Sequence, residues 1–137
     1  MPNHSPLPLF LVALALVASC AANPGSVDGD HTHRVTTTVT VTDQAILPTA
    51  NVEIPAFSSV VWRNRGSAPL EVAIEATSCG TCETVLGFAP AAHGVRSVAI
   101  APGSVATICF HEVGRFPFVT RIGSDERRGE IVVGGAQ

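Results

Sequence analysis

Two short motifs contain the residues whose side chains can bind a metal ion or exchange electrons. Cys79 and Cys82 form a Cys-x-x-Cys pair, and Cys109 and His111 form a Cys-x-His pair. The spacing of the first pair lets both thiolates bind one ion. On a β-strand, Cys109 and His111 project from the same face, because side chains two positions apart point the same way. Three thiolates and one imidazole make a four-coordinate set that suits copper or zinc.

The same cysteines have two other interpretations. In an oxidising compartment, Cys109 can form a disulfide bond with Cys79 or Cys82, which leaves one thiol over. A shared metal ion would account for that odd cysteine. A thioredoxin-like redox pair at Cys79 and Cys82 requires a helix start after a strand of a parallel sheet, which the sequence does not predict. We therefore predict a metal site at Cys79, Cys82, Cys109 and His111, with a metal-free, disulfide-stabilised domain as the alternative.

The N-terminus has the features of an export signal. Residues 9–18 form an apolar run that is too short to span a bilayer and ends before Ser19 and Cys20. The segment Val17–Cys20 resembles the lipobox of bacterial lipoproteins, so we expect residues 1–19 to be removed as a signal peptide and Cys20 to carry a lipid. The alternative is an ordinary signal peptide cut after Ala22. Both alternatives export the chain.

The segment after Cys20 is expected to be a flexible tether. Residues 20–33 are rich in Ala, Pro, Gly, Ser and Asp and have no apolar periodicity. The remaining residues, 34–135, are expected to form one small domain whose modest core benefits from a crosslink or a metal ion. The expected location is the cell envelope, with the lipid anchoring the protein to a membrane that faces the periplasm or the exterior.

Composition argues against several functions. Charged residues make up 14% of the chain, the formal net charge is −3, and the arginines are scattered, so we expect no nucleic-acid partner. The acidic residues form no recognisable catalytic pair, and neither a glycine-rich phosphate loop nor a nucleophile elbow occurs. We therefore expect that the protein is not an enzyme.

The domain has the pattern of an all-β fold. Short runs of β-branched and apolar residues alternate with Pro, Gly, Asn and Ser, which predicts a Greek-key β-sandwich of about eight strands. Alternation is clearest at residues 70–76 and at Ile108 and Phe110, whose faces are expected to meet in the core. Residues 83–88 are expected to form a helical turn. The expected strands are 35–43, 51–55, 59–64, 69–77, 95–101, 104–111, 115–121 and 129–133.

Several segments together resemble the cupredoxins, the family of plastocyanin and azurin. The segments are Ile54–Asn64 with Ala68–Val72, and later Ala101–Ser104, Gly114–Phe118 and Arg128–Val133. The resemblance covers roughly residues 35–134. It implies the family's sandwich fold more than any activity.

The usual copper ligands of that family are missing. The resemblance places the first histidine ligand at Leu70, the cysteine at Val119 or Thr120, and the second histidine at Ile122 or Gly123. From residue 112 to residue 137 the chain has no Cys, His or Met. A copper centre of two imidazoles and a thiolate therefore cannot form at the family's usual pole.

If the cupredoxin topology holds, the four candidate ligands lie together at the opposite pole. The resemblance and the exported location favour copper over zinc as the metal. The sequence thus predicts a cupredoxin-like lipoprotein that binds copper at Cys79, Cys82, Cys109 and His111, in electron transfer or copper handling, with a redox or copper-transfer protein as its partner. The alternative is a metal-free β-sandwich that serves as a structural or interaction module at the cell envelope.

Overall fold

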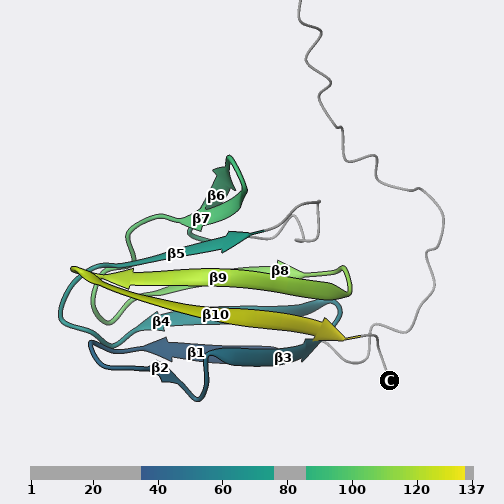
Figure 1. Ribbon diagram of the computed structural model, residues 1–137, viewed down its shortest axis with the longest axis horizontal. Coiled ribbons are helices and arrows are strands. Elements are labelled where there is room, and N and C mark those ends of the chain that lie inside the picture. Colours follow the sequence, from purple (N-terminus) through teal and green to yellow (C-terminus); the bar gives the residue numbers. More distant parts are fainter. Residues whose placement is uncertain (1–34, 76–85, 135–137) are drawn as a thin grey trace, which may run out of the picture.

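The fold consists of β-strands, as the sequence predicts. The computed structural model describes residues 35–75 and 86–134, in which ten strands and no helix occur (Figure 1). Within these two ranges, no helix suitable for crossing a membrane is found. The strands form a four-stranded and a six-stranded sheet, each with both parallel and antiparallel neighbours.

The smaller sheet contains the Cys109 strand at its edge. Its order is β2 (Ile46–Leu47), β1 (Thr36–Val41), β4 (Ser58–Asn64) and β8 (Val105–Phe110). Strand β1 runs parallel to β4, and β4 runs antiparallel to β8 with Ser59 opposite Cys109.

The larger sheet contains the last strand of the domain next to β3. Its order is β3 (Asn51–Pro55), β10 (Asp125–Gly134), β9 (Gly114–Ile122), β5 (Leu70–Glu75), β7 (Gly94–Ser97) and β6 (Phe88–Ala91). Strand β3 runs parallel to β10, whereas the other neighbours in this sheet are antiparallel.

The core lies between the two sheets, where the inward residues of alternating strands meet. Leu70, Val72 and Ile74 from β5 belong to the same buried cluster as Ile108 and Phe110 from β8, which confirms the predicted faces. Residue 76, the last of the predicted β5 face, lies outside the described residues. The apolar contact between the sheets includes an edge-to-face pair of Trp62 and Phe118, with ring centroids 4.8 Å apart.

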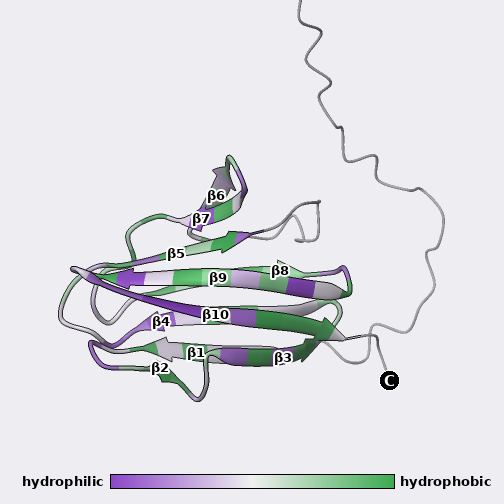
Figure 2. Cartoon of the chain, viewed as in Figure 1, coloured by the Kyte–Doolittle hydropathy of each residue, from purple (hydrophilic) through white to green (hydrophobic). Residues whose placement is uncertain are grey.

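Three details differ from the sequence prediction. Strands β2 and β6 were not expected, so the described residues hold ten strands rather than eight. The predicted helical turn is wrong where it can be seen: Leu86 pairs with Thr107 as an isolated bridge and Phe88 begins β6, while residues 83–85 lie outside the described residues. Strand β10 begins four residues earlier than the expected 129–133 strand, because its hydrophilic first half continues a hairpin with β9 (Figure 2).

The strands define two poles of the sandwich. The Leu70 pole contains the start of β5, the start of β8 and the turn between β9 and β10. The His111 pole contains the ends of β5 and β8, the turn between β3 and β4, and the start of β1 (Figure 1).

Candidate functional site

The Leu70 pole, where the resemblance to cupredoxins would place copper, is filled by apolar side chains. Leu70 and Ile122 are direct partners in the β5–β9 pairing, and both are buried. Strands β9 and β10 continue toward each other until Ile122 pairs with Asp125, which leaves a turn of only Gly123 and Ser124. A tight hairpin therefore occupies the place of the expected ligand loop.

Asn64 holds the backbone of the Leu70 pole together. Its side-chain amide nitrogen donates to the carbonyl oxygens of Ala68 and Ile100, both at 2.8 Å. Its side-chain oxygen accepts a hydrogen bond from the Gly66 amide at 2.8 Å. Asn64 is fully buried, so these bonds satisfy its polar atoms where no water can. The amide connects the β4–β5 loop to the segment before β8.

Thr120, one of the two positions for the missing cysteine ligand, is also buried. Its hydroxyl donates a hydrogen bond of 3.4 Å to the Arg127 carbonyl oxygen across the β9–β10 hairpin. Leucine and isoleucine offer no donor atom, and this hydroxyl is already used within the hairpin. The side chains at the Leu70 pole thus do not fit a type 1 copper ion.

At the His111 pole, Cys109 and His111 have the arrangement that the Cys-x-His spacing predicts. Ile108 and Phe110 are buried. Cys109 in β8 and His111, directly after the end of this strand, are half-buried. Strand β5 ends at Glu75 at the same pole, a few residues before the Cys-x-x-Cys pair in the sequence. Cys79 and Cys82 themselves lie outside the described residues, so the four-residue metal set stays a prediction.

Cys109 takes part in a disulfide bond. The other cysteine of that bond lies outside residues 35–75 and 86–134, because Cys109 is the one cysteine in these ranges. A disulfide sulfur is not a thiolate and does not ligate copper or zinc as one. In the part of the chain that is described, no group of three or more His, Cys, Asp or Glu side chains is placed to hold a metal ion.

His111 packs against an aromatic ring that the sequence did not single out. Its imidazole stacks on Phe57, with ring centroids 6.4 Å apart and an angle of 28° between the rings. Its Nε2 lies 3.9 Å from a carboxylate oxygen of Glu112. Stacking orients the ring of His111 along the surface of the His111 pole.

Phe57 has an unusual backbone conformation for a large residue. It forms the turn between β3 and β4 with a φ of 62°, in the left-handed region that favours glycine. Its side chain is exposed. No pattern of residue types predicts a left-handed backbone conformation at a phenylalanine. The position of Phe57 between two predicted strands does indicate a turn.

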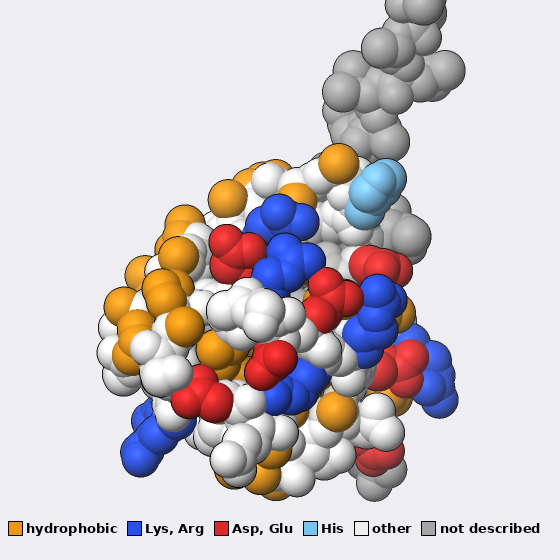
Figure 3. All heavy atoms as spheres, turned by 60° about the vertical axis from the view of Figure 1, so that its left-hand side comes forward, with side chains coloured by type: hydrophobic (Ala, Val, Ile, Leu, Met, Phe, Trp, Pro, Cys, Tyr) orange, Lys and Arg blue, Asp and Glu red, His pale blue; other side chains and the backbone are white. Residues whose placement is uncertain are grey.

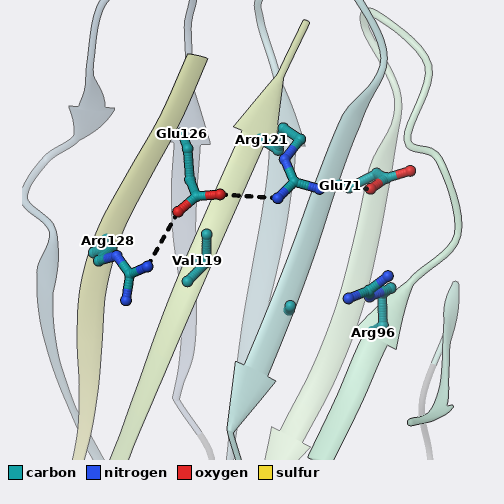
Figure 4. Close-up of a pocket in the computed structure, with 7 residues that line it drawn as sticks. Glu71, Arg96, Val119, Arg121, Glu126 and Arg128 are labelled. Atoms are coloured by element: carbon teal, nitrogen blue, oxygen red, sulfur yellow. Dashed lines mark hydrogen bonds and ion pairs between the residues drawn. The ribbon is translucent and has the colours of Figure 1, made fainter. Parts of the chain in front are cut away.

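The outer face of the larger sheet has a shallow depression lined by charged side chains (Figure 4). Glu126 forms ion pairs with Arg121 at 2.8 Å and with Arg128 at 3.2 Å. The hydrogen bond from Arg121 lowers the pKa of the Glu126 carboxyl, and the same bond raises the pKa of the Arg121 guanidinium. Glu71 lies 4.0 Å from Arg121. Both signs are thus interspersed and largely neutralise each other, as they also do across the face shown in Figure 3.

The comparisons with known proteins support the fold and not a particular activity. No family model matches the chain, and no curated protein matches it. Among solved structures, amicyanin from Paracoccus versutus (Thiobacillus versutus) is 18% identical, with 72% of this chain and 81% of that chain covered at a TM-score of 0.50. A reduced Cu(I) form of an amicyanin variant is 14% identical, with 80% of this chain and 86% of that chain covered at a TM-score of 0.50.

Amicyanin is a cupredoxin, so the predicted cupredoxin-like fold is confirmed. At these identities the likeness is one of architecture, because a fold carries no function without its site. The amicyanin structure is a Cu(I) form, whereas in this chain the pole at which the sequence resemblance would place copper contains the buried pair of Leu70 and Ile122.

Proposed function

We propose that this chain is an exported, lipid-anchored protein of the bacterial cell envelope that uses a cupredoxin-like fold as a structural or interaction module. The observation that carries the proposal is the pairing of buried Leu70 with buried Ile122 at the pole where cupredoxins place copper. The module would act through its surface and not through a redox centre at that pole.

The Cys109 disulfide supports this function. A disulfide stabilises a small exported domain by about 2–4 kcal/mol, chiefly by restricting the unfolded chain. If Cys20 carries the lipid, the sequence offers only Cys79 and Cys82 as partners for Cys109. Covalent attachment of β8 to the preceding segment would compensate for the modest core of a domain of this size.

A second candidate is the copper site at Cys79, Cys82, Cys109 and His111. The placement of Cys109 and His111 on one side of β8, at the pole where β5 ends, favours it. A thiolate site requires the disulfide to be reduced first, with two electrons and two protons supplied by a dithiol reductant. In that form the protein would carry an electron or deliver Cu(I) to a redox or copper-transfer partner.

Metal binding and thiol counting separate the two candidates. The detergent-solubilised protein is prepared without reductant and, in parallel, after reduction with a dithiol that is then removed. Bound copper, bound zinc and free thiols are measured in both samples. If the protein is a metal-free module, neither sample should contain a stoichiometric metal ion. One copper ion per reduced chain would instead support the second candidate, provided that Cys109→Ser and His111→Ala abolish it and His93→Ala, at an exposed histidine, does not.

The anchor has its own test. A mature chain that begins at Cys20 and has the added mass of a diacylglycerol would support lipidation. The Cys20→Ser variant should lose that mass and the membrane association of the mature protein. A mature N-terminus at Asn23 would show that an ordinary signal peptide is removed and that the protein has no lipid anchor.

A further inference from the structure

Apolar side chains are exposed together at the His111 pole. Phe57, Val113 and Val35 are 53%, 65% and 44% exposed. They are neighbours in space: the Val35 amide donates to the Ser58 hydroxyl oxygen next to Phe57, and Phe57 stacks on His111, two residues before Val113. The His111 pole therefore has an apolar tip built from three separate segments of the chain.

The conformation of Phe57 argues that this apolar tip has a role outside the domain. A left-handed conformation is unfavourable for a non-glycine residue because of its β-carbon, whereas glycine adopts it freely. An exposed phenylalanine also costs solubility, since its ring stays in contact with water. A glycine would form the same turn without either cost. Within the described residues the Phe57 ring stacks on His111, and about half of its surface stays exposed and available for a contact outside the domain.

The path of the chain identifies what lies beyond the His111 pole. Strand β1 begins at this pole directly after Val35, and the 14 residues 21–34 connect it to Cys20. A chain of that length reaches at most about 50 Å when fully extended. The inference rests on the proposed lipid anchor: if Cys20 is held in a bilayer, the His111 pole is the part of the domain from which the tether departs.

We propose that the His111 pole rests on the phospholipid bilayer that holds the anchor, with Phe57 and Val113 inserted at the lipid–water interface. An aromatic ring with neighbouring aliphatic side chains suits this interface. The charged residues of this pole do not form a basic patch: Arg115 is paired with Glu130, and Glu75 and Glu112 are acidic. Apolar insertion and not attraction to anionic lipids would therefore provide the contact. Such a tip binds weakly alone and adds to the lipid chain as a second membrane signal.

Fluorescence quenching by lipid tests this contact. The lipidated protein is reconstituted into phosphatidylethanolamine–phosphatidylglycerol vesicles whose acyl chains carry bromine, which quenches tryptophan that it touches. Phe57→Trp places a probe at the tip, and Val98→Trp places a matched probe at another exposed apolar residue, after the strand β7 that runs back toward the Leu70 pole. Trp62 is buried and gives the same background in both variants. We expect bromine to reduce the fluorescence of Phe57→Trp and to leave that of Val98→Trp unchanged.

Equal quenching of the two probes, or none in either, would overturn the proposal. Protection of the Phe57→Trp probe from a water-soluble quencher without any effect of bromine would also overturn it and would indicate a protein partner. The intact mass of each sample separates these results from failure of the anchor, because a chain without lipid contradicts the proposed function before vesicles are added. Phe57→Gly should retain the melting temperature in detergent but lose hydrogen-exchange protection at residues 111–113 on vesicles.

Discussion

At the scale of single residues, Asn64 and Leu70 show how the Leu70 pole is stabilised without a metal ion. Asn64 bonds three backbone groups, the carbonyls of Ala68 and Ile100 and the amide of Gly66. Leu70 exchanges two backbone hydrogen bonds with Ile100, at 2.9 Å and 2.8 Å, and its side chain faces the core. Hydrogen bonds and apolar packing therefore fix the loops of this pole.

Asn64→Ala should destabilise the protein by about 2–3 kcal/mol, because three hydrogen bonds are lost and the Ala68 carbonyl and the Gly66 amide lose the partner that Asn64 gives them. Asn51→Ala is the matched control, since Asn51 is exposed and should cost less than about 0.5 kcal/mol. Urea unfolding of both variants measures the difference. Similar midpoints for the two variants would contradict the role of the Asn64 amide.

The ion pairs of Glu126 should make a pH-dependent contribution to stability. The pKa of its carboxyl lies below the ordinary 4.5 in the folded protein, so the contribution is complete above that pH and disappears as the pH falls through the lower, folded value. Since the pairs are exposed, salt should weaken them. The melting temperatures of wild type and Glu126→Gln should differ most at neutral pH and converge in strong acid or high salt. A difference in melting temperature that grows as the pH falls would contradict this prediction.

Part of the candidate site follows from sequence and part does not. Strand alternation correctly predicts that Cys109 and His111 face away from the core, because period two fixes the face of each residue. The resemblance places Leu70, and Ile122 or Gly123, where cupredoxins have histidine ligands, and the structure shows Leu70 and Ile122 paired and buried there. Spacing alone does not determine whether Cys109 is a thiolate or part of a disulfide, since both states need the same proximity. The role of Phe57 depends on a backbone angle that its residue type disfavours.

At the scale of elements, the strands that the sequence predicted are those with apolar alternation. Strand β6 contains Pro90 between two alanines, which disfavour strands, and it forms only because β7 pairs with it at the sheet edge. Strand β2 has only two residues and ends before Pro48. The first half of β10 is charged and takes its strand conformation from the β9 hairpin. Pairing with an adjacent strand, and not the residue types of the segment itself, thus determines these three segments.

Gly129 is required where β10 lies close to β9 and the segment before β3. A β-carbon at this position would lie 2.3 Å from both the Ala50 carbonyl oxygen and the Phe118 ring. Gly129→Ala should therefore destabilise the protein by about 2 kcal/mol or more. Gly114→Ala, at the start of β9, is the control, because its nearest neighbour would lie at an ordinary 3.6 Å. Thermal unfolding compares them, and equal melting temperatures would refute the close approach.

At the scale of the whole molecule, Arg127 connects the two sheets across the Leu70 pole. From β10 in the larger sheet, its guanidinium donates to the carbonyl oxygens of Thr42, at 3.1 Å, and Asp43 in the β1–β2 connection of the smaller sheet. Asp43 in turn accepts a hydrogen bond from the Ser67 amide at 2.8 Å. A set of polar contacts thus closes the pole outside the apolar packing of Leu70 and Ile122.

The adjacent arginines provide an internal comparison. Arg127→Ala should destabilise the protein by about 1–2 kcal/mol, because hydrogen bonds from a charged group to partly buried carbonyls are lost. Arg128→Ala should change stability by less than about 0.5 kcal/mol, since Arg128 is exposed and makes only a surface ion pair. Chemical denaturation of both variants tests this order. A larger loss of stability in Arg128→Ala than in Arg127→Ala would contradict the prediction.

The parallel pairing of β3 with β10 has a consequence for when the domain can fold. Strand β3 lies near the start of the domain and β10 at its end, so the larger sheet is incomplete until the last strand is present. Contacts between distant segments also form slowly. If the chain is exported as we propose, an extended precursor would benefit, because it cannot complete this sheet before its last strand is present. The pairing of β3 with β10 that completes the larger sheet of the mature domain would thus keep its precursor unfolded and competent for translocation.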